Sequence, residues 1–175
     1  MDRLYAPWRM AYIDQPAPAK EHSHNGDCVF CSKARSQDDL VNLVVFKGVH
    51  AFVLMNVYPY TNGHVMVAPY DHTANLDDLS ADTLTEIMLL TRRAVDALRI
   101  SIHPDGYNIG MNLGKVAGAG IADHLHMHIV PRWDGDTNFM PVIAETKILP
   151  DSLESSFNKL RIAWETLEDQ DHAKP

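Results

Sequence analysis

The sequence is poor in cysteine, in positive charge and in long apolar runs. It has only 2 cysteines among 175 residues, and in a reducing compartment their C-x-x-C spacing argues against a structural disulfide. The formal net charge is -8, so the chain as a whole has no attraction for nucleic acid or for an anionic membrane. No apolar run approaches the roughly 18 residues that would span a bilayer. A bound phosphate group would therefore need a local source of positive potential.

The N-terminal stretch has no signal-peptide core, because charges and prolines interrupt it. We therefore expect a cytoplasmic protein with no nucleic-acid and no membrane partner. The length and the 46% share of hydrophobic residues fit a soluble globular domain. We expect an N-terminal arm and linker (1–27), a main domain (28–149), and a C-terminal helix with an acidic tail (150–175). The tail, "EDQDHAKP", is expected to be disordered.

The order of predicted elements favours an α+β fold with a five-stranded, mainly antiparallel sheet. The runs "LVNLVVF" and "HAFVLMN" predict a hairpin, and "HVMVAP", "YNIGMNL" and "HLHMHIV" predict three more strands. Ser80 is a candidate N-cap for one long helix over 81–100, where apolar residues recur at helical spacing. Asp151 and Glu154 resemble a capping box before a C-terminal helix.

Three histidines, His124, His126 and His128, occupy alternate positions of the last predicted strand. Side chains alternate between the faces of a strand, so these three imidazoles share one face. Such a set fits a metal site that uses all three histidines, or a nucleophilic imidazole that the others support. The spacing alone leaves both open. The preceding loop, "GKVAGAGIAD", is rich in small residues that let backbone amides approach an anion such as phosphate.

The run "HLHMHIV" resembles the H-φ-H-φ-H-φ-φ signature, with φ apolar, of the histidine triad (HIT) superfamily of nucleotide hydrolases and transferases. The resemblance extends to "FVLMNVYPYTNGHVMVAPYDH", "GMNLGKVAGAG" and "HIVPRWDGDTNF". The arm "LYAPWRMAYI" and the added C-terminal helix are most similar to the bacterial diadenosine polyphosphate hydrolase and phosphorylase-like branch. The resemblance implies a HIT-like fold and a homodimer in which two sheets join edge to edge.

The resemblance also implies a mechanism. His126 matches the nucleophile that attacks the α-phosphate of a nucleoside 5′-phosphate derivative, with dinucleoside polyphosphates such as diadenosine tetraphosphate favoured. Water or phosphate then releases the nucleotide, and no catalytic metal is required. The His128 side chain is expected to contact the phosphate or the bridging oxygen, and its carbonyl to hold the second N–H of His126. His64 is expected to lie near the triad and orient it.

Further positions match nucleotide-binding residues of the family. Asn56 is expected near the ribose and Asn112 along the site. Backbone amides that would receive phosphate charge belong to Gly118, Ala119, Gly120 and Ile121. Some branches carry Gln or Ser where this chain has Gly120 and Ile121, so handling of the leaving group is expected to differ here.

The two cysteines, Cys28 and Cys31, have C-x-x-C spacing. A redox pair, two separate thiols and half of a zinc site are all compatible with this spacing. The resemblance implies a structural zinc held by this pair together with His72 and His124. His124 would then hold the metal and leave the chemistry to the two histidines that follow it.

Two other functions remain open from the residues alone. One is a metal-dependent hydrolase that uses the triad as its metal site, which a chelator would stop without unfolding the protein. The other is a nucleotide-binding module without catalysis, which would bind AMP and turn over no nucleotide.

Overall fold

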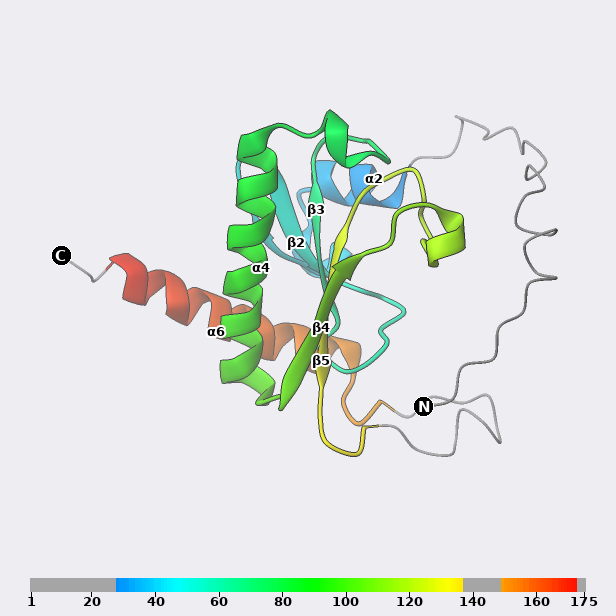
Figure 1. Cartoon of the computed structure of the whole chain (residues 1–175). Helices are drawn as coiled ribbons and strands as arrows, with labels where there is room; N and C mark the ends of the chain where they lie inside the picture. The colour runs from blue at the N-terminus through cyan, green and yellow to red at the C-terminus, as the bar shows by residue number, and fades with distance from the viewer. Residues whose placement is uncertain (1–27, 137–148, 173–175) are drawn as a thin grey trace, which may run out of the picture.

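The computed structural model describes residues 28–136 and 149–172, so the predicted arm over 1–27 lies outside the described residues (Figure 1). The strands are β1 (Val44–Lys47), β2 (Ala51–Met55), β3 (Val65–Pro69), β4 (Gly106–Met111) and β5 (Met127–Arg132). The helices are α2 (Val29–Arg35), α3 (Asp39–Asn42), α4 (Ala81–Ile102) and α6 (Leu153–His172), with short 3₁₀ turns at Leu76–Asp78 and Lys115–Ala117.

The five strands form one antiparallel sheet in the order β1-β2-β3-β5-β4. This confirms the predicted α+β fold and five-stranded sheet. One row of paired residues crosses four of the strands: Val44 pairs with Leu54, Leu54 with Met66, and Met66 with His128. The row therefore connects the edge strand β1 with the strand that carries His128.

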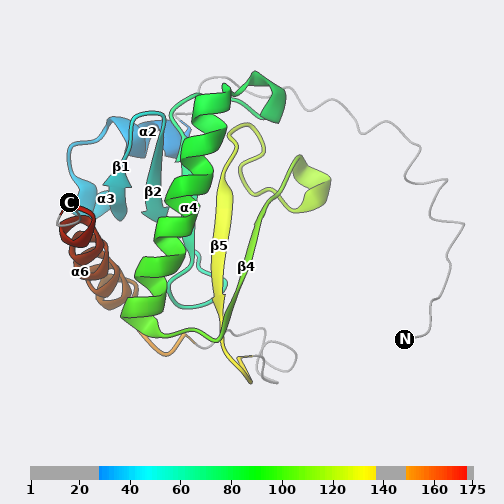
Figure 2. The ribbon, with the colours of Figure 1, turned by 60° about the vertical axis from the view of Figure 1, so that its left-hand side comes forward.

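Alternate side chains of the central strands enter two separate apolar clusters, one on each face of the sheet. Val53 and Val67 pack in the larger cluster with residues of α4 and α6. Leu54 and Met66 point the other way and pack with Phe30 of α2. Figure 2 shows α4 crossing in front of the sheet while α2 lies behind it. Helix α2 and the long helix thus cover opposite faces.

Helix α4 begins as the sequence predicts. The Ser80 side chain accepts a hydrogen bond from the Thr83 amide at 3.1 Å, which satisfies one of the first N–H groups of the helix. The helix continues to Ile102, two residues past the predicted end, and His103 ends it in the left-handed conformation at φ 49°. Its buried face supplies much of the larger apolar cluster.

Two N-terminal elements differ from the prediction. The strand expected from Leu40 begins at Val44, because Asp38 caps the Val41 amide and Asp39–Asn42 form the short helix α3. Leu43, at φ 56°, then turns the chain into β1. Helix α2 was not predicted, since its seven residues are too few to display a helical period.

Helix α6 also departs from the prediction at both ends. Ser152, rather than Asp151, caps it, because the Ser155 amide donates to the Ser152 hydroxyl at 3.1 Å. The tail expected to be disordered is helical as far as His172, and Asp171 forms an ion pair with Arg93 of α4 at 3.2 Å. No helix in 28–136 or 149–172 has the length and apolar character that crossing a membrane requires.

Candidate active site and metal site

The three histidines of the triad lie on the α2 side of the sheet, as the alternation predicts. Strand β5 begins only at Met127, so the expected strand over 124–130 is wrong for its first three residues. That segment is nevertheless held in place, because the Leu125 amide donates to the Thr73 carbonyl at 2.8 Å. The Phe30 ring packs against His124 and His126, with ring centroids 5.1 Å and 4.8 Å away. The three imidazoles are buried.

The first histidine belongs to a cluster of four potential metal ligands from three parts of the chain. His124 Nδ1 lies 3.3 Å from Cys28 Sγ and 3.3 Å from His72 Nδ1, and Cys31 Sγ lies 3.4 Å from His72 Nδ1. All four ligand atoms lie within 4.8 Å of one another. Helix α2 explains the thiol pair, since Cys28 is its N-cap and Cys31 lies in its first turn. The four residues could hold one metal ion.

The tautomer of His124 and the two neighbouring thiols favour a bound metal ion. His124 Nε2 lies 2.9 Å from the Pro69 carbonyl, which can only accept, so the proton is on Nε2 and the lone pair on Nδ1 faces the thiols. Burial, followed by the neighbouring Cys28, raises the pKa of Cys31. Two adjacent thiolates therefore need a cation between them. Within the described residues this is the only such group of ligands, and it includes neither His126 nor His128. The geometry thus gives no support to a metal held by all three histidines.

His126 is fixed by its own backbone. Its Nδ1 lies 2.9 Å from the carbonyl of His124, so Nδ1 carries the proton and the lone pair is on Nε2. The expected partner, the His128 carbonyl, is wrong. His128 lies within β5 and is paired with strands on both sides, whereas His124 precedes the strand. Burial lowers the pKa of His126, partly offset by this hydrogen bond, which favours the neutral ring.

A chain of hydrogen bonds also fixes the protons of His128. The Tyr60 amide donates to His64 Nδ1 at 3.1 Å, so the proton of His64 is on Nε2. That Nε2 lies 2.9 Å from His128 Nδ1, which must accept. Neutral His128 therefore carries its proton on Nε2, and this atom has no hydrogen-bond partner within the part of the chain that the structure describes. Burial, followed by the neighbouring His126, lowers the pKa of His128 to about 4.

The Asn56 side chain supports the same chain of bonds. Its Oδ1 accepts from the Tyr58 amide at 3.0 Å, so its amide nitrogen faces His64 Nδ1 at 3.3 Å. The bond between His64 Nε2 and His128 Nδ1 is the predicted contact between His64 and the triad. Asn56 also reaches the cavity described next, where its role toward a ribose stays a prediction.

A cavity of about 490 Å³ lies between α2, the sheet and the loop before the triad. His126 and His128 line it, together with apolar residues of α2, β2 and β3. From the loop, Gly118, Gly120 and Ile121 line it, whereas Ala119 and Asn112 are not among its lining residues. The predicted contacts of these residues with a nucleotide stay predictions. Further lining residues that the sequence did not single out are Val29, Phe30, Lys33, Tyr58 and Tyr60.

The glycine-rich loop has its own internal hydrogen bonds. The amides of Gly118 and Ala119 donate to the carbonyls of Lys115 and Gly114, at 3.0 and 3.4 Å. Gly118 has φ 94°, a conformation that glycine adopts without strain. Asn112 donates to the Gly118 carbonyl at 3.5 Å, so it contacts the loop rather than the cavity. Of the four loop amides predicted to receive charge, those of Gly120 and Ile121 donate to no other residue within 28–136 and 149–172.

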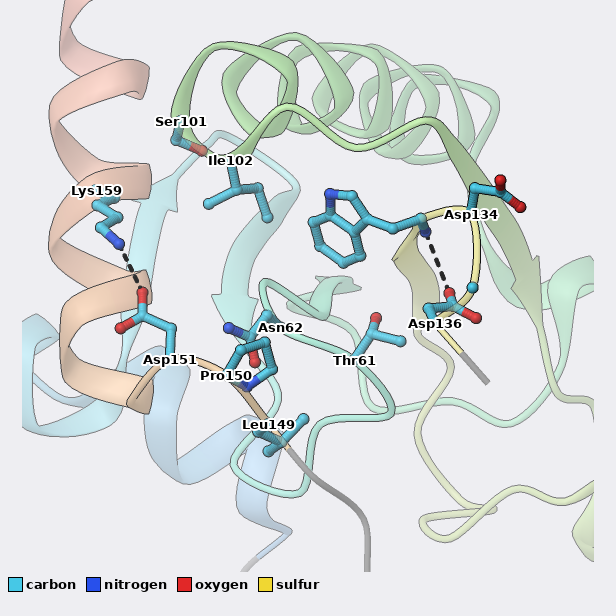
Figure 3. Close-up of a pocket in the computed structure, with 12 residues that line it drawn as sticks. Thr61, Asn62, Ser101, Ile102, Asp134, Asp136, Leu149, Pro150, Asp151 and Lys159 are labelled. Atoms are coloured by element: carbon cyan, nitrogen blue, oxygen red, sulfur yellow. Dashed lines mark hydrogen bonds and ion pairs between the residues drawn. The ribbon is translucent and has the colours of Figure 1, made fainter. Parts of the chain in front are cut away.

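A second cavity of about 520 Å³ lies near the end of α4 and the start of α6 and has a different character (Figure 3). Asp134 and Asp136 lie on one side of it, and Asp151 pairs with Lys159 at 2.8 Å on the other. Neither histidine nor cysteine lines it. Its acidic lining disfavours an anionic ligand, so the histidine-lined cavity is the candidate active site.

The five-stranded antiparallel sheet and the neighbouring rings of His126 and His128 can now be compared with known protein families. The HIT domain family model matches residues 38–135, and the chain belongs to this family. Among solved structures, a Zn-bound histidine triad family protein from Mycobacterium smegmatis superposes with a TM-score of 0.66 and 30% identity, covering 82% of this chain and 97% of the other.

Named relatives narrow the comparison. The AP-4-A phosphorylase of Mycobacterium tuberculosis is 35% identical over 165 residues, which cover 94% of this chain and 85% of the relative. The adenosine 5′-monophosphoramidase of Saccharomyces cerevisiae is 32% identical over 107 residues, which cover 61% of this chain and 63% of the relative. These comparisons confirm the predicted family and the prediction that the chain is an enzyme of it.

Proposed function

We propose that this protein transfers a nucleotidyl group from a dinucleoside polyphosphate, such as diadenosine tetraphosphate, to phosphate or water through a covalent bond to His126. The proposal rests above all on the protons of two neighbouring rings. His126 directs a lone pair on Nε2, and His128 an N–H on its Nε2, while both rings line one cavity. A nucleophile beside a hydrogen-bond donor is what substitution at phosphorus requires.

The steps follow from these positions. His126 Nε2 attacks the α-phosphorus, an N–P bond forms, and the P–O bond to the leaving polyphosphate breaks. The N–H of His128 donates to the oxygen that leaves, and the amides of Gly120 and Ile121 receive charge on the phosphoryl oxygens. An oxygen of phosphate or water then attacks the same phosphorus, the N–P bond breaks, and His126 returns to its neutral form.

Substrate choice comes from the relatives. The AP-4-A phosphorylase match spans nearly the whole chain, which favours a dinucleoside polyphosphate with phosphate as the acceptor. The monophosphoramidase match covers less of the chain, and a P–N substrate is the second candidate. A nucleotide-binding module without catalysis is disfavoured, because both histidines have the protons that the reaction needs.

We further propose that Cys28, Cys31, His72 and His124 hold a structural zinc ion. A tetrahedron with Zn–N of about 2.0 Å and Zn–S of about 2.3 Å has N–N edges of about 3.3 Å and N–S edges of about 3.5 Å. Four of the six distances between the ligand atoms match these edges: 3.3 Å between the two nitrogens and 3.3 to 3.6 Å for three nitrogen–sulfur pairs. Such a closed site would tie α2 to the triad segment and take no part in the reaction.

We also propose that the protein is a cytoplasmic homodimer. Strand β4 is one edge of the sheet, and its outer side has no partner strand in the described residues. The other edge, β1, contacts α3 and α6. Pairing of two copies through β4 is therefore the expected assembly, and light scattering of the purified protein would measure its mass.

The test is a product analysis with diadenosine tetraphosphate, with and without phosphate. Phosphorolysis predicts ADP and ATP only when phosphate is present, whereas hydrolysis predicts AMP and ATP without it. A denaturing quench followed by mass spectrometry should find an AMP adduct on the wild type and none on His126→Ala. An exposed histidine, His50, provides the matched control His50→Ala. Turnover by His126→Ala at the wild-type rate would refute the proposed nucleophile.

A further inference from the structure

The cavity has two chemically different ends. Among the described residues that line it, Lys33 carries the only permanent charge, and no carboxylate is present. Lys33 comes from the last turn of α2, whereas His126 and His128 come from the triad segment. A cation that lines an otherwise largely apolar pocket indicates a specific polar contact with a ligand.

The register of the sheet separates these two ends. Lys33 Nζ donates to the Asn42 carbonyl at 2.6 Å, just before β1 begins at Val44. Val44 lies in the same cross-strand row as His128, three strands away. With strands about 4.8 Å apart, these two ends of the row are on the order of 14 Å apart. Through this bond Lys33 is held toward the β1 end of the row, whereas His128 lies at its other end.

The floor between the two ends is apolar. Leu54 and Met66, the two middle members of the row, line the cavity on this face. If the α-phosphate of a nucleotide lies at His126, the base lies over this floor and its edge points toward Lys33. Burial lowers the pKa of Lys33, so its ammonium is poorly hydrated and gains from an acceptor on a ligand.

We propose that Lys33 is a specificity-determining residue that donates to the edge of the bound base and favours 6-oxopurine nucleotides. This inference rests on the proposed nucleotide site and refines its substrate: among dinucleoside polyphosphates, those that carry a 6-oxopurine base should bind more tightly than diadenosine tetraphosphate. An ammonium has donors only. Guanine and hypoxanthine present two adjacent acceptors, O6 and N7, whereas adenine places its N6 amino donor beside N7. The same lysine therefore strengthens binding of GMP and IMP more than binding of AMP.

Titration calorimetry with GMP, IMP, AMP and ribose 5-phosphate tests this assignment on the full chain. Lys33→Met should weaken GMP and IMP about tenfold, since a good pair of base contacts discriminates by roughly that factor. AMP should change by less than about threefold, and ribose 5-phosphate should not change. Lys33→Arg, which keeps the charge and the donors, should restore most of the GMP affinity.

Lys47→Met is the matched control. Lys47 also donates to a backbone carbonyl, that of Ser36, yet it does not line the cavity. It should leave all four affinities unchanged, which separates loss of a base contact from loss of a structural lysine. Equal losses for ribose 5-phosphate and GMP, or no loss of GMP affinity in Lys33→Met, would overturn the inference. A wild type that binds none of the three nucleotides would instead refute the proposed function.

Discussion

His124 and His126 are two residues apart, both buried and both in contact with Phe30, yet their surroundings differ completely. His124 bonds the Pro69 carbonyl through Nε2 and turns Nδ1 toward two thiols. His126 bonds a carbonyl through Nδ1 and leaves Nε2 toward the cavity. The carbonyl that each ring meets selects its tautomer, and the tautomer decides which ring suits a metal and which suits phosphorus.

The largest expected effect is on His126. Replacing it with Ala removes the proposed nucleophile, so kcat should fall by at least about 10³-fold, as for other covalent nucleophiles. AMP binding and the melting temperature should stay close to the wild-type values, because the ring contributes no metal ligand. Steady-state kinetics, calorimetry and thermal melting measure the three quantities. If the variant unfolded instead, His126 would have a structural role like that of His124.

The second prediction concerns His124 and its partners. Removing the metal with a chelator should destabilise the fold, because binding energy of a structural zinc is folding energy. The melting temperature should drop by roughly 10 °C or more, as a loss of several kcal/mol would produce in a domain of this size. Metal analysis should find one zinc per chain, and Cys31→Ser should reproduce the drop without a chelator. If the chelator stopped turnover and left the melting temperature unchanged, the metal would act in catalysis and not in folding.

A smaller effect is expected at His64, which fixes the protons of His128. His64→Leu removes the donor, so kcat should fall about 10- to 100-fold, the usual cost of losing a group that orients a catalytic residue. His64→Gln keeps an N–H and should recover part of the rate. Pre-steady-state formation of the adduct measures the effect on chemistry alone. Equal rates for the two variants would mean that packing, not the proton, is what His64 provides.

The smallest effect is a dependence of stability on pH. Burial and His126 lower the pKa of His128 to about 4, below the ordinary value of 6.5. Between these values the unfolded chain binds the proton and the folded chain does not, so stability falls as the pH falls from 7 toward 4. From pH 7 to 5 this group should cost about 2 kcal/mol.

Denaturant unfolding at the two pH values measures that loss. His128→Gln should lose about 2 kcal/mol less than the wild type over this interval. The matched variant His50→Gln alters an exposed histidine and should lose as much as the wild type. Identical losses in all three proteins would show that His128 is not the group that titrates.

Features whose pattern repeats over many residues were predictable from the sequence. The helix over 81–100 displays its apolar face over several turns, and the alternation of Leu125, Met127 and Ile129 with the histidines places the triad on one face. The four metal ligands were predicted from the resemblance, and the structure places their ligand atoms together. Their roles, and the domain boundaries at 28 and 150, stay predictions.

Features that depend on register or on short elements were not predictable. Helix α2 is too short to show a period, so its contribution to the cavity wall was missed, although helical C-x-x-C spacing could have indicated it. The partner of His126 was wrong because β5 begins later than its pattern predicts. The row from Val44 to His128, which runs along the floor of the cavity, exists only once the strands are paired.

Helix α2 has one further consequence. Its Cys28 cap and Cys31 belong to the metal cluster, while Val29 and Lys33 form cavity wall. This short helix and its cap therefore serve two tasks. Modification of either thiol would therefore act on a helix that also forms part of the cavity wall.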